Sequence, residues 1–306
     1  MKQATSPARP AQARPSLLPL LAAAVGLALI VLLSIWIKSP WWQAVVLGVV
    51  EGLTEFLPIS STGHLLITSQ LLGFENNIGG TFEIFIQLGA VLAVVGYYAR
   101  DLLLQARAVT HDAMTRRFWI GIVVAFLPAA IIGLFLRDWI KRVLFTSPAV
   151  IAWSLIIGGV VFLVVEWLPR RQVTVRDVTR ISPVQALGVG IVQVLALVPG
   201  VSRSGASIIG GMLGGLDRKT ATAFSFYLAI PTLGAATVVD LLGSLGKLGA
   251  GDLGRLLVGT LVAMVVAWAS IGWLLRYVAN HSFVAFGIYR IIAGAVILLL
   301  LGVGVL

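Results

Sequence analysis

Long apolar segments alternate with short polar segments along most of the chain. Six of the apolar segments have the length of about 20 residues that a helix needs to cross a bilayer. They are residues 82–99, 118–136, 148–167, 221–240, 254–276 and 284–305. A further apolar segment, Ser16–Ile37, follows a basic, Pro-rich stretch, and we expect a membrane anchor because its end offers no small-residue cleavage site. The pattern predicts an all-α protein that crosses a membrane several times.

Two other apolar regions, residues 43–73 and 183–215, are interrupted at their centres by polar clusters. The first cluster is PISSTGH at residues 58–64, and the second is PGVSRSG at residues 199–205. Irregular backbone at membrane depth is stable only where protein or a wet cavity satisfies its polar groups. Each region is therefore predicted to be a helix–loop–helix hairpin that dips into the membrane and returns to the side it entered from.

The two hairpins are related by an internal repeat. At an offset of 142 residues Ser60 lies over Ser202, and the similarity continues on both sides of these residues. Each half, at about 41–167 and 183–306, holds one hairpin and three spanning helices. An odd number of crossings turns the second copy upside down, which is an inverted-topology repeat with both polar tips near the midplane. Residues 1–40 stand outside this repeat as a basic tail and extra anchor.

Composition agrees with a membrane protein and excludes several other classes. The 306 residues are 59% apolar and 11% charged, with a mean hydropathy of +1.02, which one soluble core cannot hide. The absence of Cys excludes disulfides, thiolate catalysis and cysteine-bound metals. A net charge of +10 does not indicate nucleic acid, because the basic residues lie mainly in short loops between apolar segments.

The positions of the basic residues predict the orientation in the membrane. With the N-terminus inside, the loops at 100–117 and 168–182 fall inside and the segment at 241–253 falls outside. Of the 22 Lys and Arg residues, few lie in the predicted outside segments. They are Lys38, Arg137, Lys141, Arg142, Lys247 and Arg255. This excess of positive charge inside favours the orientation.

Two carboxylates, Glu51 and Glu55, lie one helical turn apart in an otherwise apolar segment, so they share one face. A charged side chain at mid-membrane costs roughly 2.5–3.5 kcal/mol on insertion scales, so such residues generally have a function. If the pair faces water, it holds a divalent cation, Mg²⁺ or Ca²⁺, or shares a proton. The alternative is a pair that is hydrogen-bonded to a neighbouring helix.

Hydroxyl residues in both polar clusters precede apolar half-helices, where they are good N-caps. They are Ser60, Ser61 and Thr62 in the first cluster, and Ser202 and Ser204 in the second. Two facing helix N-termini favour an anion, and Arg203 adds a guanidinium suited to bidentate phosphate contact. The clusters therefore indicate a phosphate or diphosphate cradle. The alternative is that the hydroxyls only cap the helices while Arg203 pairs with Glu51 or Glu55.

His64 is the one histidine within the polar clusters, since His111 and His281 fall in predicted loops. It follows Ser60 by four residues and Ser61 by three, so a helical turn brings its imidazole near a hydroxyl or a bound phosphoryl group. The alternative is a core histidine with satisfied hydrogen bonds. Weaker polar candidates, equally explained by contacts between helices, are Glu83, Gln193, Asp240 and Arg290.

Taken together, EGLTEFLPISSTGH at residues 51–64 and PGVSRSGAS at 199–207 resemble the undecaprenyl-diphosphate phosphatase family, also called the bacitracin-resistance family. The resemblance covers roughly residues 41–306, and the first 40 residues depart from the common pattern. Flanking segments that also look similar are FEIFIQLGA (82–90), FSFYLAIP (224–231) and AFGIYR (285–290). Many members have Thr where Ser207 stands here, which keeps the hydroxyl.

The resemblance implies a multi-pass enzyme of the bacterial cytoplasmic (inner) membrane whose active site opens to the periplasmic side. Its implied activity is hydrolysis of undecaprenyl diphosphate to undecaprenyl phosphate and inorganic phosphate, which recycles the lipid carrier of peptidoglycan synthesis and confers bacitracin resistance. The implied partners are this polyprenyl diphosphate and membrane lipid, without nucleic acid, and a homodimer is one open arrangement. The competing interpretation is a secondary transporter or lipid-carrier flippase, because inverted repeats also build transporters.

The resemblance implies that Glu51 and Glu55 are the acidic pair of the family motif. It also implies polar partners for the diphosphate, namely Ser61, His64, Ser202, Arg203 and Ser207, to which the capping argument above adds Ser60, Thr62 and Ser204. The candidate catalytic residues are Glu51, Glu55, Ser61, His64 and Arg203, and the candidate diphosphate-binding residues are Ser60, Thr62, Ser202, Ser204 and Ser207. Arg203 and the helix N-termini are expected to hold the diphosphate, while Glu51 and Glu55 bind Mg²⁺ or Ca²⁺ or supply the acid. Ser61 or His64 is expected to be the nucleophile or to activate water, and the choice between them stays open.

Overall fold

The computed structural model describes residues 39–74, 81–144, 147–168, 173–244 and 250–306. Within these ranges the regular structure is helical, with one isolated β-bridge between Val175 and Leu216. The predicted anchor at Ser16–Ile37 lies outside the described residues. The α-helical content predicted from the sequence is therefore confirmed for the part of the chain that is described.

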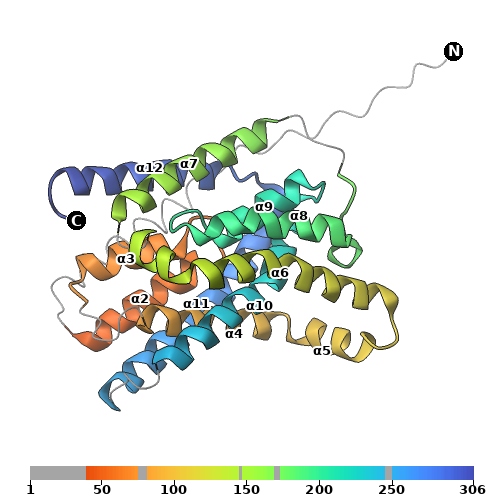
Figure 1. Cartoon of the computed structure of the whole chain (residues 1–306), viewed down its shortest axis with the longest axis horizontal. Coiled ribbons are helices and arrows are strands. Elements are labelled where there is room, and N and C mark those ends of the chain that lie inside the picture. Colours follow the sequence, from red (N-terminus) through yellow and green to blue (C-terminus); the bar gives the residue numbers. More distant parts are fainter. Residues whose placement is uncertain (1–38, 75–80, 145–146, 169–172, 245–249) are drawn as a thin grey trace.

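The helices follow one another in the order shown in Figure 1. The first half contains α2 (Pro40–Thr54), α3 (Ser61–Leu71), α4 (Thr81–Tyr97), α5 (Ala99–Ala108), α6 (Ala113–Trp139), the π-helix η1 (Ile140–Leu144) and α7 (Pro148–Trp167). The second half contains the 3₁₀-helices η2 (Val178–Arg180) and η3 (Val194–Leu197), with α8 (Pro183–Gln193), α9 (Arg203–Leu213), α10 (Arg218–Ser244), α11 (Ala250–Asn280) and α12 (Val284–Gly302).

Five helices, α6, α7, α10, α11 and α12, are long and apolar enough to cross a membrane, as predicted. The predicted segment at 82–99 differs, because α4 has only 17 residues and the chain then bends by 68° into α5. The polar residues of α5, beginning with Arg100 and Asp101, explain why the apolar helix ends there. The length of α4 lies at the lower limit of about 17 residues for a span. The protein is a multi-pass helical membrane protein.

Each predicted hairpin is a pair of helices separated by a turn, α2 with α3 and α8 with α9. Each hairpin packs on a long helix of the other half, α2 on α11 and α8 on α6. The approach is close at glycines: a Cβ added to Gly48 would lie 2.6 Å from the Gly259 carbonyl oxygen, and one added to Gly190 would lie 2.3 Å from that of Ala125. Gly48 and Gly190 are 142 residues apart, so both halves use a small residue at the same repeat position.

The last helices of the two halves, α7 and α12, lie side by side (Figure 1). A Cβ added to Gly159 would lie 2.6 Å from the Gly287 carbonyl oxygen, and one added to Gly294 would lie 2.5 Å from that of Ala152. The contacting positions therefore descend along α7 as they ascend along α12. The helices α7 and α12 therefore run antiparallel to each other.

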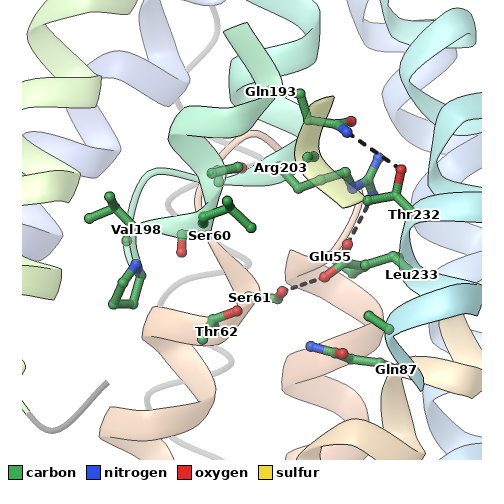
Figure 2. A pocket seen from close by; sticks show the side chains of 17 residues that line it. Glu55, Ser60, Ser61, Thr62, Gln87, Gln193, Val198, Arg203, Thr232 and Leu233 are labelled. Carbon is green, nitrogen blue, oxygen red and sulfur yellow. Dashed lines mark hydrogen bonds and ion pairs between the residues drawn. The ribbon is translucent and has the colours of Figure 1, made fainter. Parts of the chain in front are cut away.

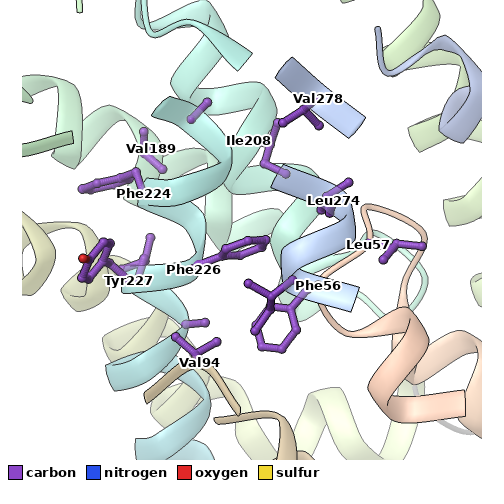
Figure 3. Packing of buried hydrophobic residues seen from close by; sticks show 14 of the residues in the cluster. Phe56, Leu57, Val94, Val189, Ile208, Phe224, Phe226, Tyr227, Leu274 and Val278 are labelled. Carbon is purple, nitrogen blue, oxygen red and sulfur yellow. The ribbon is translucent and has the colours of Figure 1, made fainter. Parts of the chain in front are cut away.

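A buried aromatic cluster holds the first hairpin turn against the second half (Figure 3). The ring of Phe56, in that turn, meets the ring of Phe226 from α10 edge to face, with centroids 5.2 Å apart. Leu274 of α11 and Ile208 of α9 belong to the same cluster, and all four side chains are fully buried. Because truncating such an aromatic costs about 3–5 kcal/mol, this packing fixes the turn that precedes the polar cluster.

Candidate functional site

The return helix of each hairpin begins at a serine in an unusual conformation. Ser60 and Ser202 have φ values of 72° and 76°, and no other non-glycine residue in the described ranges has a positive φ. Their hydroxyls accept hydrogen bonds from the backbone N–H groups of Gly63 and Gly205, at 3.4 and 3.1 Å. Of the hydroxyl residues predicted as N-caps, Ser60 and Ser202 are confirmed, whereas Ser61, Thr62 and Ser204 already belong to the first turns of α3 and α9. Backbone strain of order 1–3 kcal/mol at two equivalent positions commonly marks functional sites.

Arg290 ties the two hairpin turns together from within the core. Its side chain is fully buried, and its guanidinium donates to the carbonyl oxygens of Pro58 at 3.0 Å and Gly200 at 2.9 Å. It also donates to the carbonyl of Ser154 on α7, at 3.2 Å. Pro58 and Gly200 are again 142 residues apart. Arg290, one of the weaker candidates from the sequence, therefore connects the same backbone position of both hairpins.

A cavity of about 190 Å³ lies between the two hairpin turns (Figure 2). Among the predicted site residues its walls contain Glu55, Ser60, Ser61, Thr62, Ser202 and Arg203. The wall also contains Gln193, which was one of the weaker candidates, and two polar residues that were not predicted, Gln87 and Thr232. The structure thus brings together most of the predicted site, while Glu51, His64, Ser204 and Ser207 lie outside the cavity wall.

The centre of the cavity is a chain of contacts from Ser61 through Glu55 to Arg203 (Figure 2). Nη2 of Arg203 lies 2.9 Å from Oε1 of Glu55, and the Ser61 hydroxyl donates a hydrogen bond to Oε2 of the same carboxylate. Both charged side chains are less than a tenth exposed. The ion pair matches the alternative in which Arg203 neutralises a glutamate. Nε of Arg203 is nevertheless buried without a hydrogen-bond partner among the described residues.

Behind this centre, two serines of α9 hold Arg203 and the first turn in place. Ser207 donates to the hydroxyl of Ser225 at 2.7 Å, and Ser225 in turn accepts hydrogen bonds from Arg203 through its carbonyl at 2.9 Å and its hydroxyl at 3.3 Å. The Ser204 hydroxyl donates to the carbonyl of Leu57 at 2.9 Å, which joins the second hairpin to the first. Both predicted residues therefore support the site rather than line it.

His64 lies on the first turn of α3 and does not line the cavity. Its Nδ1 is 2.7 Å from the carbonyl oxygen of Ser60, and its Nε2 is 2.7 Å from the hydroxyl of Tyr289. The two rings are nearly parallel, with centroids 5.7 Å apart. Both ring nitrogens therefore have protein partners, and the contacts of this histidine are those of a residue that holds the turn.

Glu51 lies one helical turn before Glu55 and is completely buried. Neither of its carboxylate oxygens has a hydrogen-bond partner among the described residues. An ionised, unpaired carboxylate in the interior costs several kcal/mol, so this group fits a bound cation or a proton. No group of three His, Cys, Asp or Glu side chains that could hold a metal is found in the described part of the chain. A cation here would take further oxygen ligands from hydroxyls, water or phosphate, as Mg²⁺ and Ca²⁺ do.

The residues that sequence reasoning missed lie in apolar segments but carry polar groups. Ser225 belongs to FSFYLAIP, Thr232 follows it directly, Gln87 belongs to FEIFIQLGA and Tyr289 to AFGIYR. These residues could have been found from the sequence, because the segments that contain them already resembled the family. Gln193 donates to the Thr232 hydroxyl at 3.4 Å, and its own carbonyl oxygen is buried without a partner in the described residues. The cavity therefore draws polar groups from four separate segments.

Comparison with known proteins agrees with this site. The family model of the bacitracin resistance protein BacA matches residues 44–296. A protein from Albidiferax ferrireducens named undecaprenyl-diphosphatase is 49% identical over 262 residues, covering 84% of this chain and 93% of its own length. A protein of the same name from Deinococcus radiodurans is 47% identical over 271 residues, covering 87% and 97%. The chain therefore belongs to the bacitracin resistance protein BacA family.

Proposed function

We propose that this protein hydrolyses undecaprenyl diphosphate to undecaprenyl phosphate and inorganic phosphate, and so recycles the lipid carrier of peptidoglycan synthesis. The observation that carries the proposal is the buried contact chain of Ser61, Glu55 and Arg203 in one cavity. It combines a hydroxyl, a carboxylate that accepts its proton and a guanidinium for the anion, which are the groups that phosphoryl transfer needs. The names of the similar proteins agree with this activity.

In the proposed reaction Ser61 is the nucleophile and Glu55 is its base. The Ser61 oxygen forms a bond to the terminal phosphorus while its proton passes to Glu55. The bond from that phosphorus to the bridging oxygen breaks, and undecaprenyl phosphate leaves. Water then attacks the phosphoserine, its oxygen forms a bond to phosphorus, and the bond from phosphorus to the serine oxygen breaks. Phosphate leaves with the protons of the water, and the serine oxygen takes back the proton held by Glu55. Ser61 is preferred over His64 because it lines the cavity and already donates to a carboxylate, whereas both nitrogens of His64 have other partners.

Arg203 and the two capped helix N-termini are proposed to hold the diphosphate. The free Nε–H of Arg203 and the first-turn N–H groups after Ser60 and Ser202 offer donors to phosphate oxygens. Glu51 and Glu55 are proposed to bind Mg²⁺ or Ca²⁺, which would supply charge neutralisation to the diphosphate. The fully buried, unpartnered carboxylate of Glu51 supports this part of the proposal.

We further propose that the two halves form an inverted-topology repeat whose site opens to the periplasmic side. The antiparallel contact of the equivalent helices α7 and α12 and the matched glycines Gly48 and Gly190 support this topology. Membrane-dipping hairpins follow from it, because α2 and α8 then enter from opposite faces. The homodimer stays a prediction.

The topology is tested with single cysteines, since the chain has no cysteine of its own. Asp138→Cys and Arg180→Cys both replace exposed residues. A membrane-impermeant maleimide added to intact cells should label Asp138→Cys and leave Arg180→Cys unlabelled. The opposite pattern, or labelling of both, contradicts the inverted arrangement.

The proposed activity is tested by phosphate release from undecaprenyl diphosphate by the purified protein, before and after treatment with EDTA. We expect release that EDTA abolishes and Mg²⁺ or Ca²⁺ restores. Release that is insensitive to EDTA would remove the cation from the proposal but leave hydrolysis. Lipid-carrier flipping or transport is the second candidate, because antiparallel repeat helices are also found in transporters. A protein that releases no phosphate but moves a labelled lipid carrier across a vesicle membrane would favour this second candidate.

A further inference from the structure

Gln193, the last residue of α8, is a buried amide in the wall of the cavity between the two hairpin turns. The residue is only 1% exposed. Its amide nitrogen donates a hydrogen bond to the hydroxyl of Thr232 on α10 at 3.4 Å, whereas its carbonyl oxygen Oε1 has no hydrogen-bond partner among the described residues. A buried acceptor without a partner costs about 1–3 kcal/mol, so this oxygen is suited to a donor that enters the cavity.

Thr232 determines which end of the Gln193 amide is left without a partner. The hydroxyl of Thr232 donates its own proton to the carbonyl oxygen of Leu228, one turn earlier in α10, at 2.7 Å. Because a hydroxyl has a single proton, the Thr232 oxygen can only accept a hydrogen bond from Gln193, and the amide group that faces it must be NH₂. A rotated amide would place two acceptors against each other. The hydrogen bonds of α10 therefore hold Gln193 with its carbonyl oxygen as the free acceptor.

A second glutamine shows that an unpartnered amide oxygen is not sufficient by itself. Gln105 of α5 also donates to a hydroxyl, that of Tyr227 at 3.3 Å, and its Oε1 is also buried without a partner among the described residues. Gln105 does not line the cavity, whereas Gln193 shares the cavity wall with Ser61 and Arg203. The location of Gln193 beside the proposed reacting groups is therefore what distinguishes the two amides.

Gln193 occupies the repeat position of Glu51, which lies 142 residues earlier. The carboxylate of Glu51 does not line the cavity, whereas the neutral amide of Gln193 does. A carboxylate in the cavity wall would repel a bound phosphate, because two like charges at short range raise each other's free energy. A neutral carbonyl oxygen accepts a hydrogen bond without this repulsion. The residue type at position 193 therefore fits a neutral donor, such as water, beside a phosphate.

Ser61 and Gln193 lie at opposite ends of the cavity wall that Figure 2 shows, with Glu55 and Arg203 between them. A phosphoryl group bonded to the Ser61 oxygen therefore has its far side towards Gln193. In phosphoryl transfer the attacking and leaving oxygens are roughly in line, so water must approach from this far side. A water molecule occupies about 30 Å³ in the liquid, so the cavity of about 190 Å³ has room for a phosphoryl group and a water beside it.

We infer that Gln193 orients the water that releases phosphate from Ser61, an inference that rests on the proposed function. Oε1 of Gln193 accepts a hydrogen bond from one O–H of the water and so directs a lone pair of the water oxygen at phosphorus. The amide takes no proton: the water's protons leave with the phosphate, and the Ser61 oxygen takes back the proton held by Glu55. Glutamine amides orient the attacking water in other phosphoryl-transfer enzymes. Thr232 is a positioning residue, because it acts only by holding the amide.

Gln193→Met tests this role, because it keeps an unbranched side chain of similar length and removes the carbonyl oxygen. The substrate is undecaprenyl diphosphate with a radioactive terminal phosphate, and acid quenching separates labelled protein, released phosphate and undecaprenyl phosphate. The first turnover, measured as undecaprenyl phosphate formed, should stay within about threefold of the parent. Phosphate release should fall by about tenfold to a hundredfold, since misplacing a reactant can cost about 10²-fold. Labelled Ser61 should therefore accumulate in the variant.

A pair of variants at Thr232 tests the same step without changing Gln193. Thr232→Val removes the hydroxyl that orients the amide, and Thr232→Ser keeps it. Thr232→Val should accumulate labelled Ser61, though less than Gln193→Met, because its amide can still reach the water in some orientations. Thr232→Ser should release phosphate faster than Thr232→Val and hold less label.

Gln105→Met is the matched control, because it removes the other buried amide that donates to a hydroxyl and has a free oxygen, away from the cavity. It should keep both steps within about twofold of the parent, and thermal unfolding should show which variants are folded. If Gln193→Met does not fold, the pair at Thr232 decides alone, and equal labelling of Thr232→Val and Thr232→Ser overturns the inference.

The inference is also overturned if Gln193→Met is folded and releases phosphate within about twofold of the parent rate. Equal slowing of both steps, slow release without labelled serine, or equal label in Gln105→Met would each overturn it as well. A parent protein that releases no phosphate from undecaprenyl diphosphate instead contradicts the proposed function.

Discussion

The two hairpins have the same backbone design and opposite chemistry. Ser60 and Ser202 cap their return helices in the same left-handed conformation. At the next position, however, the first hairpin has Ser61 and the second has Arg203, and Glu55 in the first corresponds to Leu197 in the second. The first hairpin therefore supplies the acid and the hydroxyl, and the second supplies the cation. The same backbone geometry thus occurs in both hairpins, while different residues at a few corresponding positions divide the charges between them.

This division explains why the site lies between the halves and in neither of them alone. Each charged group is buried, so each needs its partner from the other hairpin to offset the loss of water. Arg290 reinforces the junction by binding the backbone of both turns. We therefore expect substitutions at positions where the two hairpins differ to lower turnover. Substitutions at positions where the two hairpins agree should lower stability instead.

The largest effect is expected at Glu55, the acid that the second hairpin lacks. Glu55→Gln keeps the shape but removes the proton acceptor of Ser61 and the partner of Arg203. Loss of a general base typically costs 10²–10⁴-fold, so turnover of undecaprenyl diphosphate should fall about a thousandfold. Phosphate release at saturating substrate measures this, with thermal unfolding as the control for folding. Near-normal turnover would show that Glu55 is a structural counter-ion.

The next effect is expected at Arg203, the cation that the first hairpin lacks. Arg203→Lys keeps the charge but loses the planar fork that reaches Glu55 and Ser225 together. Losing one preorganised donor costs on the order of 3 kcal/mol, or roughly a hundredfold in turnover. Arg218→Lys is the matched control, because Arg218 pairs with Glu166 away from the cavity. Equal turnover of the two variants would refute the role of Arg203 in holding the diphosphate.

A smaller effect, on stability, is expected at Arg290, which contacts both hairpins alike. Arg290→Lys shortens the side chain and removes the fork that reaches Pro58 and Gly200. An unsatisfied buried carbonyl costs about 1–3 kcal/mol, so the free energy of unfolding should fall by about 2 kcal/mol. A denaturant titration in detergent micelles measures this change. No loss of stability would mean that the turns are held by the aromatic cluster around Phe56 instead.

The smallest effect is expected at the two caps and should be equal in both halves. Ser60→Ala and Ser202→Ala each remove a capping hydroxyl while keeping a strained positive φ, so each should cost about 1–2 kcal/mol of stability. Ser60→Gly and Ser202→Gly relieve the strain and should change stability by only a few tenths of a kcal/mol. The same titration measures all four variants. A large difference between the stability effects at Ser60 and at Ser202 would show that the two caps are not equivalent.

The sequence predicted the helices and the two helix–turn–helix pairs well, because apolar length and the polar interruptions are local signals. It placed the helix starts slightly late: Ser61 and Arg203 already belong to the first turns of α3 and α9. It also missed the bend after α4, which depends on polar residues following a short apolar segment. Element boundaries of this kind depend on the polar residues beside each segment as well as on its length.

The candidate site was predicted less completely, because its contacts join distant segments. The motifs identified Glu55, Ser61 and Arg203, but no sequence pattern shows that Ser207 and Arg203 both bind Ser225 of the distant helix α10. The sequence also could not decide between Ser61 and His64 as nucleophile, since that choice depends on which side of α3 faces the cavity. Tertiary packing, rather than spacing, separates the residues that line the cavity from those that support it.

The central claim is that Glu55 from one hairpin and Arg203 from the other act as one unit on the diphosphate. A double-mutant cycle on kcat/KM for undecaprenyl diphosphate, with Glu55→Gln, Arg203→Lys and the double variant, tests it most directly. Residues that act as a unit show strongly non-additive losses, so the double variant should be little worse than Glu55→Gln alone. If the double variant instead loses the full product of the two single effects, the two residues act independently and the shared site is contradicted.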